Sequence, residues 1–298
     1  MNRINNFLSI LLILLLSISC NEKDKSNSNI EENWISLFNG KDLDGWDIKF
    51  SGHKLNDNYN NTFQVEDGMI RVVYDEYETF DDKYGHMYYK KPFSYYKIRF
   101  DYRFLGEQTP GGESWNVRNS GIMLHSQSAK SNDLNQDFPV SIEIQLLGGL
   151  GKGPRTTGNL CTPGTQVVFN DKLDFTHCIS SNSKTYDGNG WVNVEAIILG
   201  DQSITHIVEK DTVLVYEKPQ ITTSYLDDDW DRYGVTSKDY WKNISGKLLS
   251  EGYIAIQAES HAIDFKNIEL LNLCGCMDKK AKNYKSYFIK EDNSLCKY

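Results

Sequence analysis

The chain has little of several features that mark common classes of protein. Its 298 residues include 32 lysines and arginines against 41 aspartates and glutamates, so the formal net charge is −9. Nucleic acid is therefore not expected as a partner, because phosphate binding requires a basic surface. Helical periodicity is almost absent, and no paired CxxC spacing occurs, so the sequence argues against a helical domain and against a zinc site.

The one long apolar run, LSILLILLL, lies near the N-terminus and is too short to span a bilayer comfortably. It follows Arg3 and ends at Ser17-Ile18-Ser19-Cys20, as a secretory signal ends in small residues. We therefore expect a signal peptide at residues 1–19, and a lipidated Cys20 followed by a flexible tether over residues 20–33. Ser17 stands where a bacterial lipobox usually has Leu. The expected location is a membrane-anchored lipoprotein, periplasmic or at the cell surface, with plain secretion as the alternative.

What the chain does contain is a series of short alternating segments. Of its residues 39% are hydrophobic and 12% are aromatic, which is enough for a sizeable core. Period-two alternation recurs at 63–74, 95–105, 120–127, 140–147, 191–199, 203–210, 253–260 and 264–271. Because turn-forming residues bound these segments and no helical pattern separates them, the sequence predicts an all-β antiparallel sandwich or jelly roll.

Alternation also sorts the side chains of each predicted strand onto two faces. Ile142 and Ile144 occupy one face of their segment, whereas Glu143 and Gln145 occupy the other. Six further polar or aromatic residues lie opposite aliphatic ones in the same way: Asn119, His125, Trp191, Gln257, Glu259 and His261. A solvated face usually carries Lys, Arg, Ser and Thr, so this composition favours a ligand groove. An ordinary wet sheet face is the alternative.

Five cysteines lie beyond the N-terminal leader. In an exported protein they are expected to form disulfides rather than a metal site. Cys161 with Cys178 would close a loop, and Cys276 with Cys296 would close the C-terminal segment. Cys274 is then left without an assigned role.

Eight segments, in order along the chain, carry a resemblance to a known family. They are ISLFNGKDLDGW at 35–46, VEDGMI at 65–70, NSGIMLH at 119–125, IEIQLLG at 142–148, TGNL at 157–160, GWVNVEAIILGD at 190–201, ITHIVEKDTVL at 204–214 and GYIAIQAESHAIDFKNIEL at 252–270. Over residues 34–271 the chain resembles the 3-keto-disaccharide hydrolase family. That resemblance implies a concanavalin-like jelly roll, here over residues 34–273. The chain departs from the family at His125, where Arg is frequent, and at Glu209–Asp211, where Asn-Gly is frequent.

The resemblance implies cleavage of glycosides already oxidised at C3 of the sugar, in carbohydrate catabolism. A 3-ketone acidifies the C2 hydrogen, so that a base can remove it and the C1 oxygen can leave by elimination. Such a site needs a base, an oxyanion stabiliser and an acid near the glycosidic oxygen. Carboxylate and imidazole groups suit the first and third roles, and a divalent metal ion or amides suit the second. Whether water then completes a net hydrolysis stays open, as does the oligomeric state.

Candidate residues follow from their type and their face. Glu143 is the first candidate for catalysis because it lies mid-strand on the polar face. His125 and His261 are candidate imidazoles, and His206 is kept for the family match at ITH although it shares a face with aliphatic residues. A divalent metal, if one is used, is expected on His125 and Glu143. The candidate substrate-binding residues are Asn119, Gln145, Trp191, Gln257 and Glu259.

Two other functions stay open. A conventional retaining glycosidase on this fold needs two carboxylates about 5 Å apart. The positions next to Glu143 along its strand are Gln145, Leu146 and Leu147, none of them ionisable, which disfavours that reaction. A non-catalytic, lectin-like carbohydrate-binding module needs aromatics and amides but no acid–base pair, and nothing in the sequence excludes it.

Residues 274–298 differ in composition from the rest, being rich in lysine, poor in aliphatics and bounded by cysteines. They resemble a short module of exported bacterial proteins with the pattern Gly-Cys-x-Asp, Asn-Tyr and Asp-x-x-x-Cys. Residues 275–278, 283–284 and 292–296 carry that match. We expect a small, disulfide-stapled C-terminal appendage.

Overall fold

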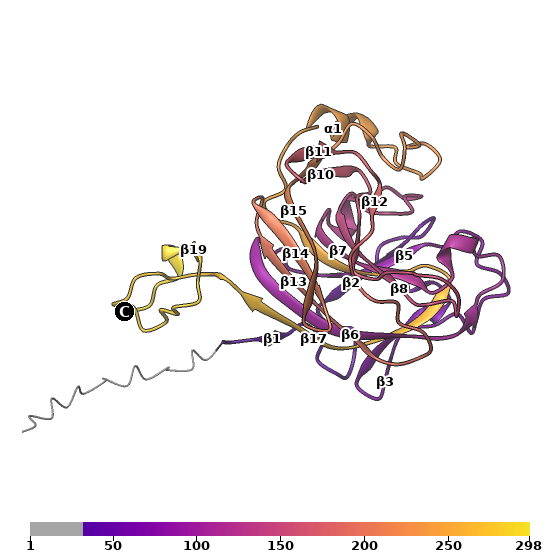
Figure 1. Ribbon diagram of the computed structural model, residues 1–298, viewed down its shortest axis with the longest axis horizontal. Coiled ribbons are helices and arrows are strands. Elements are labelled where there is room, and N and C mark those ends of the chain that lie inside the picture. Colours follow the sequence, from indigo (N-terminus) through magenta and orange to yellow (C-terminus); the bar gives the residue numbers. More distant parts are fainter. Residues whose placement is uncertain (1–31) are drawn as a thin grey trace, which may run out of the picture. The chain divides into compact units, whose positions relative to one another are not determined.

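Two antiparallel sheets, packed face to face, form the framework of the described chain (Figure 1). The structure is a computed structural model that describes residues 32–298. The expected signal peptide and Cys20 lie outside the described residues. Among residues 32–298, no helix has the length and apolar character needed to cross a membrane.

The larger sheet, called here the ten-stranded sheet, carries the long strand β6 (Tyr95–Gln108) near its middle. Its strands run in the order β11 (Lys172–Asp174), β10 (Thr165–Phe169), β15 (Asp211–Ile221), β14 (Ser203–Val208), β13 (Val192–Leu199), β6, β17 (His261–Asn272), β4 (Met69–Val72) and β3 (Phe63–Glu66), with β1 (Ile35–Ser36) also paired to β17. The predicted segment 63–74 thus forms two strands, because Asp67 and Gly68 adopt positive φ angles and turn the chain between them.

The smaller sheet, called here the seven-stranded sheet, is built around strands far apart in the sequence. Its order is β12 (Cys178–Ile179), β9 (Asn159–Cys161), β8 (Ile142–Leu147), β7 (Asn119–Ser126), β16 (Tyr253–Ala258), β5 (Gly85–Tyr89) and β2 (Trp46–Phe50). The remaining elements are short: α1 (Lys238–Asn243), four 3-10 turns η1 (Tyr59–Asn61), η2 (Ser114–Asn116), η3 (Ala129–Ser131) and η4 (Asn293–Leu295), and the parallel pair β18 (Cys274–Gly275) and β19 (Lys290–Glu291).

The core lies between the two sheets and consists of the aliphatic side chains that the alternation predicted. Ile122, Ile144 and Ile256 are buried in one continuous cluster with Phe100 and Val194 of the ten-stranded sheet. Each such side chain contributes roughly 1.5–3 kcal/mol when it is removed from water. The predicted all-β antiparallel sandwich is confirmed. Because side chains alternate, the residues between these core positions point away from the core, on the outer face of each sheet.

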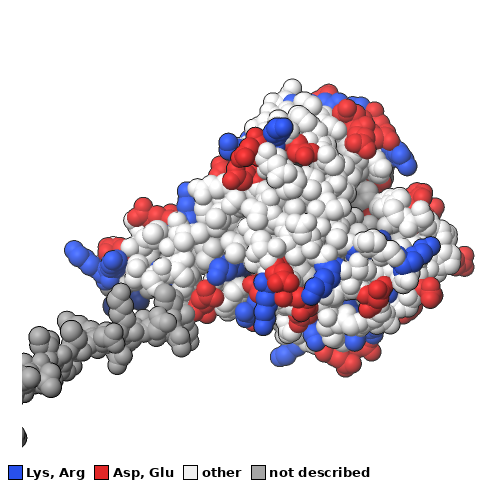
Figure 2. Space-filling view, viewed as in Figure 1, with Lys and Arg blue, Asp and Glu red and all other residues white. Residues whose placement is uncertain are grey.

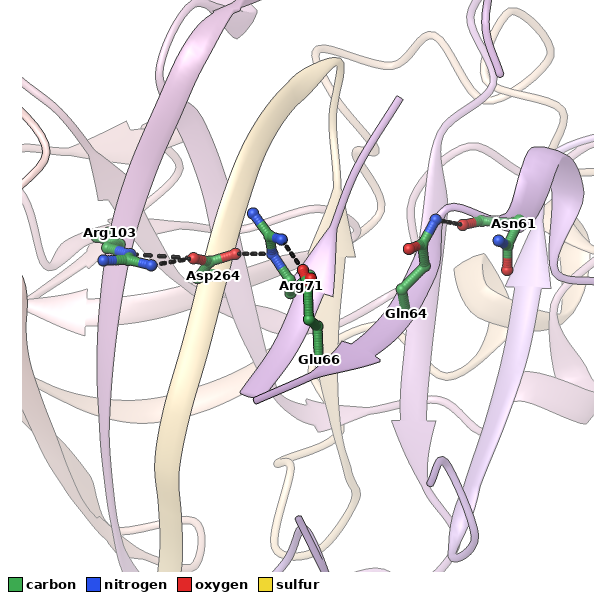
Figure 3. A network of polar contacts seen from close by, with 6 residues as sticks. All are labelled: Asn61, Gln64, Glu66, Arg71, Arg103 and Asp264. Atoms are coloured by element: carbon green, nitrogen blue, oxygen red, sulfur yellow. Dashed lines mark hydrogen bonds and ion pairs between the residues drawn. The ribbon is translucent and has the colours of Figure 1, made fainter. Parts of the chain in front are cut away.

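The outer face of the ten-stranded sheet carries a row of paired charges (Figure 3). Asp264, whose side chain is 1% exposed, accepts from Arg71 Nε at 2.9 Å and from Arg103 Nη2 at 2.8 Å. Glu66 bonds the same Arg71, and these contacts raise the pKa of the Arg71 guanidinium. The two acids and the two arginines of this row pair with one another, so the row joins strands β3, β4, β17 and β6 rather than offering a free charge.

Both predicted disulfides form, between Cys161 and Cys178 and between Cys276 and Cys296, and Cys274 is free. The first connects β9 to β12 at the edge of the seven-stranded sheet. The second closes the C-terminal segment, whose Ile289 amide donates to the Leu273 carbonyl at 3.0 Å. On the face drawn in Figure 2, acidic and basic side chains are interspersed over the surface.

Candidate active site

A cavity of about 620 Å³ opens on the outer face of the seven-stranded sheet. Residues of the central strands form most of its floor, and residues of the connections and of the sheet edge form its walls. The floor residues are Asn119 of β7, Glu143, Gln145 and Leu147 of β8, Cys161 of β9, Gln257 of β16, and Glu259 just beyond β16. The wall residues are Ser114, Trp115, Phe138, Leu150, Arg155, Pro163, His177, Cys178, Leu226, Asp227 and Tyr233.

Strand register explains why the floor is polar. Glu143 and Gln145 alternate with the core residues Ile142 and Ile144, and so they point to the cavity side. Gln145 pairs with Gly121 of β7. On the other side of β7, Ile122 pairs with Ile256 of β16, so the next residue of β16, Gln257, lies opposite Gly121. The structure therefore brings together five of the candidate residues from three strands: Asn119, Glu143, Gln145, Gln257 and Glu259.

Two of these residues are carboxyls that are almost removed from water. Glu143 is 7% exposed and Glu259 is 3% exposed. Burial raises the pKa of Glu143 to about 8. The pKa of Glu259 rises well above its ordinary value, first because of burial and second because of repulsion by Glu143, while the nearby Arg155 acts in the opposite direction. Two neighbouring buried carboxyls resist double ionisation, so the pair retains a proton that exposed glutamates would lose.

The strand that carries Glu143 gave no indication of a second carboxyl beside it. Sequence reasoning sought a partner among positions 145–147 of β8 and found none that ionises. The partner is Glu259, which follows β16 and reaches the same cavity. The prediction that Glu143 lacks a neighbouring carboxylate is therefore wrong, because β7 separates the two strands in the sheet without separating their side chains.

Gly121 is the reason that the Glu143 carboxyl can lie across β7. A Cβ atom placed on Gly121 would lie 2.3 Å from Glu143 Oε1 and 2.8 Å from its Cδ. Any side chain at this position would displace the carboxyl. The glycine of the NSGI segment therefore makes room for the functional group of the neighbouring strand.

Arg155 supplies positive charge to the cavity. Its Nη1 donates to the carbonyls of Gly148 at 2.7 Å and Arg118 at 3.3 Å, which fixes the guanidinium against the backbone. Burial, followed by the positive charge of Arg118, lowers its pKa. Sequence reasoning missed Arg155, since it lies in a glycine-rich loop where no alternation marks a side chain as inward.

Several oxygen atoms of the cavity floor have no hydrogen-bond partner. They are Asn119 Oδ1, Gln257 Oε1 and Glu259 Oε2, each buried. The orientation of Asn119 is fixed by its Nδ2, which donates to the Trp115 carbonyl at 3.2 Å. Buried acceptors rarely stay unpaired. Carboxylate and amide oxygens are also the ligands that hard divalent cations prefer, so this set fits such a cation.

His125 does not reach the cavity. A register shift between β16 and β7 occurs beside it, and its φ of 47° turns the chain locally. Its Nε2 instead pairs with the Gly200 carbonyl at 3.0 Å, in the β13–β14 turn of the other sheet, and burial lowers its pKa to about 4. Simple alternation placed His125 with Glu143. The bulge breaks that alternation, so the expected His125–Glu143 metal pair is not formed.

His206 lies in the core, as its aliphatic neighbours on the same face indicated. Its Nδ1 pairs with the Gly158 carbonyl at 2.9 Å and its Nε2 with the Tyr216 hydroxyl at 2.8 Å. Burial lowers its pKa to about 4. Both ring nitrogens of His206 have hydrogen-bond partners and the residue does not line the cavity, so His206 stabilises the core rather than the site.

His261 lies next to the charged wall of the site without lining the cavity. Both of its ring nitrogens are buried without a partner. Burial, followed by the positive charges of Arg118 and Arg155, lowers its pKa to about 4. Its ring packs edge-on against Phe104 at 5.6 Å.

Trp191 is absent from the cavity. Its ring lies between the Arg103 guanidinium at 4.5 Å and the Lys266 ammonium at 4.0 Å. Arg103 belongs to the charged row on the outer face of the ten-stranded sheet. The expectation that Trp191 faces the groove is therefore wrong, because its strand belongs to the opposite sheet.

His177 lines the cavity beside the Cys161–Cys178 disulfide. The ligand atoms of these three residues lie within 4.8 Å of one another. Because both sulfurs are consumed in the disulfide, they offer no thiolates to a metal. Burial lowers the pKa of His177 and favours its neutral form.

Comparisons with known proteins show what the chain is similar to. The 3-keto-alpha-glucoside-1,2-lyase-like domain matches residues 33–271. Among solved structures, the chain is similar to a "putative glycosyl hydrolase" from Parabacteroides distasonis, with 20% identity, a TM-score of 0.47, and coverage of 80% of this chain and 94% of that one. A carbohydrate-binding module from Bacillus subtilis is similar at 10% identity and a TM-score of 0.38, over 68% and 86% of the two chains. No curated protein matches the chain.

Proposed function

The chain belongs to the 3-keto-alpha-glucoside-1,2-lyase-like family, a glycosidase-like and carbohydrate-active group, and on that premise we propose that it cleaves glycosides carrying a ketone at C3. The observation that carries this proposal is the pair of buried carboxyls, Glu143 and Glu259, in one cavity. Elimination requires a base for the C2 hydrogen and an acid for the leaving oxygen. A pair that retains one proton offers both.

The base takes the C2 proton, and the electrons of the C2–H bond form an enolate with the C3 ketone. The enolate then restores the ketone, the C1–C2 double bond forms, and the bond from C1 to the glycosidic oxygen breaks. The acid protonates the departing oxygen. The immediate product is an unsaturated 3-keto sugar, and a later addition of water would give net hydrolysis.

The environment of each carboxyl supports a division of roles. Burial raises the pKa of Glu143 to about 8, which is near the pH at which proton transfer is most effective. The pKa of Glu259 is raised by burial and, in addition, by the negative charge of Glu143. Glu143 therefore loses its proton first and acts as the base, whereas Glu259 keeps its proton and acts as the acid. Arg155, fixed at the cavity wall, stabilises the enolate oxygen.

A divalent cation is compatible with this site. Asn119 Oδ1 and Gln257 Oε1 are the unpaired amide oxygens that would hold it, rather than His125, which leaves Glu143 as the base and the protonated Glu259 as the acid. When bound, such a cation polarises the C3 ketone as a Lewis acid. The amide of Asn119 stays oriented in either case by its bond to the Trp115 carbonyl.

A conventional glycosidase is the second candidate function, and one observation favours it. Glu259 provides the second carboxyl that direct hydrolysis requires. The two reactions differ in substrate, since direct hydrolysis does not need the C3 ketone. A lectin-like module is a third possibility, and it would bind without cleaving.

The decisive experiment compares matched 3-keto and unoxidised glycosides with purified protein. We expect turnover of the 3-keto compounds alone, reduced roughly 10²-fold or more in Glu143→Gln and in Glu259→Gln. Glu269→Gln is the matched control, because Glu269 pairs with Arg99 on the ten-stranded sheet, and it should retain wild-type turnover. Cleavage of the unoxidised glycoside would indicate a conventional glycosidase, and binding without product would indicate a lectin.

We also propose that the protein acts outside the cytoplasm, held to a membrane by lipid on Cys20. The two disulfides support an oxidising compartment. The residues of the lipobox resemblance support the anchor. A carbohydrate substrate delivered to the cell surface or the periplasm fits both.

A further inference from the structure

Trp115 is a large aromatic side chain that stays open to solvent at the cavity. It is 47% exposed, whereas Phe138 on the same wall is 7% exposed. It belongs to the 3-10 turn η2, which leads into β7. Exposing half of an indole costs hydrophobic stabilisation, so a ring held in this way at a cavity indicates a surface for a ligand.

The indole is fixed from behind. Its ring stacks on that of Tyr84 with an interplanar angle of 7° and a centroid distance of 6.2 Å. Tyr84 packs against Phe80 at 5.0 Å and against Phe138 at 4.7 Å, and its hydroxyl accepts from Asn116 Nδ2 at 3.2 Å. The turn and its aromatic support therefore hold Trp115 in one orientation before any ligand arrives, which lowers the entropy cost of binding.

The same turn is connected to the floor of the site. Asn119 Nδ2 donates to the carbonyl of Trp115 at 3.2 Å, and Asn119 lies on the floor with Glu143 and Glu259. One cavity of about 620 Å³ thus contains both the carboxyl pair and the indole. That volume lies within the range of pockets that enclose a ligand of drug size, roughly 300–1,000 Å³, which leaves room beyond one sugar ring.

We propose that Trp115 is the platform for the leaving group, and that the preferred substrates carry a ring there. This inference rests on the proposed function, because it places the oxidised sugar at the carboxyl pair. The recognised chemistry is a six-membered ring with a flat apolar face, supplied by a phenol or by the C–H face of a second pyranose. Phe138, Leu226 and Tyr233 continue the apolar wall, so the ring is recognised by packing more than by hydrogen bonds.

The test measures kcat/KM for three 3-keto glucosides that differ in the leaving group: methanol, phenol and glucose. Wild type should prefer the two ring-bearing substrates over the methyl glycoside. In Trp115→Ala that preference should fall about tenfold, and Trp115→Phe should restore part of it. Trp191→Ala is the matched control, since Trp191 lies on the other sheet and should leave the preference unchanged.

A preference retained in Trp115→Ala would overturn the proposal, and so would an equal loss for all three substrates. If only the phenyl substrate responds, the platform serves aryl leaving groups. If only the disaccharide responds, it serves sugars.

A binding measurement separates this inference from the reaction. Tryptophan fluorescence is titrated with the unoxidised methyl and phenyl glucosides and with cellobiose. Ring-bearing ligands should bind about tenfold more tightly than the methyl glucoside, and Trp115→Ala should abolish the difference. This result without any turnover would leave the platform standing and reject the proposed reaction. Equal affinities for all three ligands, together with turnover of 3-keto glycosides, would reject the platform and support the proposed reaction.

Discussion

At the scale of single residues, the two carboxyls that serve the proposed chemistry also cost stability. Burial raises the pKa of Glu143 from an ordinary value near 4.5 to about 8 in the folded state. Between these values the folded protein holds a proton that the unfolded chain has released. The free energy of unfolding therefore decreases as the pH rises from about 4.5 to about 8, and the loss persists above that range.

Replacing Glu143 by Gln removes this titration and should stabilise the protein at alkaline pH. We expect the free energy of unfolding of Glu143→Gln to exceed that of wild type by roughly 4–5 kcal/mol at pH 8.5, and by only about 1 kcal/mol at pH 5. Urea titrations at the two pH values measure this directly. Glu269→Gln, whose site pairs with Arg99 on the other sheet, is measured alongside as the control. A Glu143→Gln effect that is the same at pH 5 and pH 8.5 would contradict the assigned pKa.

Single residues also show where sequence reasoning succeeded and where it failed. Alternation located Glu143 and Gln257 correctly, because regular strand geometry carries side chains to one face. It failed at His125, since a bulge changes the face without leaving a mark in the hydrophobic pattern. Arg155 and Trp115 lie in irregular segments, where no periodicity exists to predict the direction of a side chain.

At the scale of elements, β7 acts as the bridge between the two carboxyls, and Gly121 is its critical position. Gly121→Ala places a methyl group where Glu143 Oε1 now lies, so the carboxyl must move while the strand stays paired. We expect kcat/KM to fall at least tenfold, with circular dichroism unchanged. Gly190→Ala is the control, because a Cβ there meets no atom within 4 Å, and its activity should equal wild type. Full activity in Gly121→Ala would show that the position of Glu143 is not critical.

The edge of the seven-stranded sheet depends on the disulfide between β9 and β12. Cys161 and Cys178 are separated by 17 residues, and closing such a loop stabilises the fold by roughly 3 kcal/mol on the chain-entropy account. Because both cysteines line the cavity, the double Ser variant should lose that stability and also activity. Denaturant titration and kcat/KM measure the two effects.

The second disulfide provides the comparison. Cys276 and Cys296 close the C-terminal segment and do not line the active-site cavity. Replacing both by Ser should leave kcat/KM within about twofold of wild type. If the two double variants lose activity alike, the effect of the Cys161–Cys178 bond on the site is not specific.

At the scale of the whole molecule, the parts of the site differ in how far the sequence predicts them. The sandwich and the polar floor could be predicted, because they depend on alternation repeated over many strands. The walls could not, since residues such as Asp227 and Tyr233 come from long connections whose course depends on tertiary packing. The second carboxyl, Glu259, was predicted in part. Alternation predicts which face of the sheet it occupies, but its position beside Glu143 depends on the order of the strands.

Membrane attachment is also a property of the whole chain. If lipid on Cys20 anchors the protein, Cys20→Ala should move it from the membrane fraction to the soluble fraction after cell fractionation. Turnover of 3-keto glycosides by the released protein should match that of wild type, because the cavity is formed by residues 114–259. Retention of Cys20→Ala in the membrane fraction would reject the lipid anchor.

In the proposed reaction, cleavage begins with removal of the C2 proton. The most direct measurement is the single-turnover rate of leaving-group release from a 3-keto glycoside that carries either hydrogen or deuterium at C2. We predict a primary isotope effect, with the deuterated substrate reacting more slowly, because the C2–H bond breaks during the proton transfer to Glu143. Equal rates for the two substrates, with equally fast cleavage of the unoxidised glycoside, would contradict the elimination mechanism.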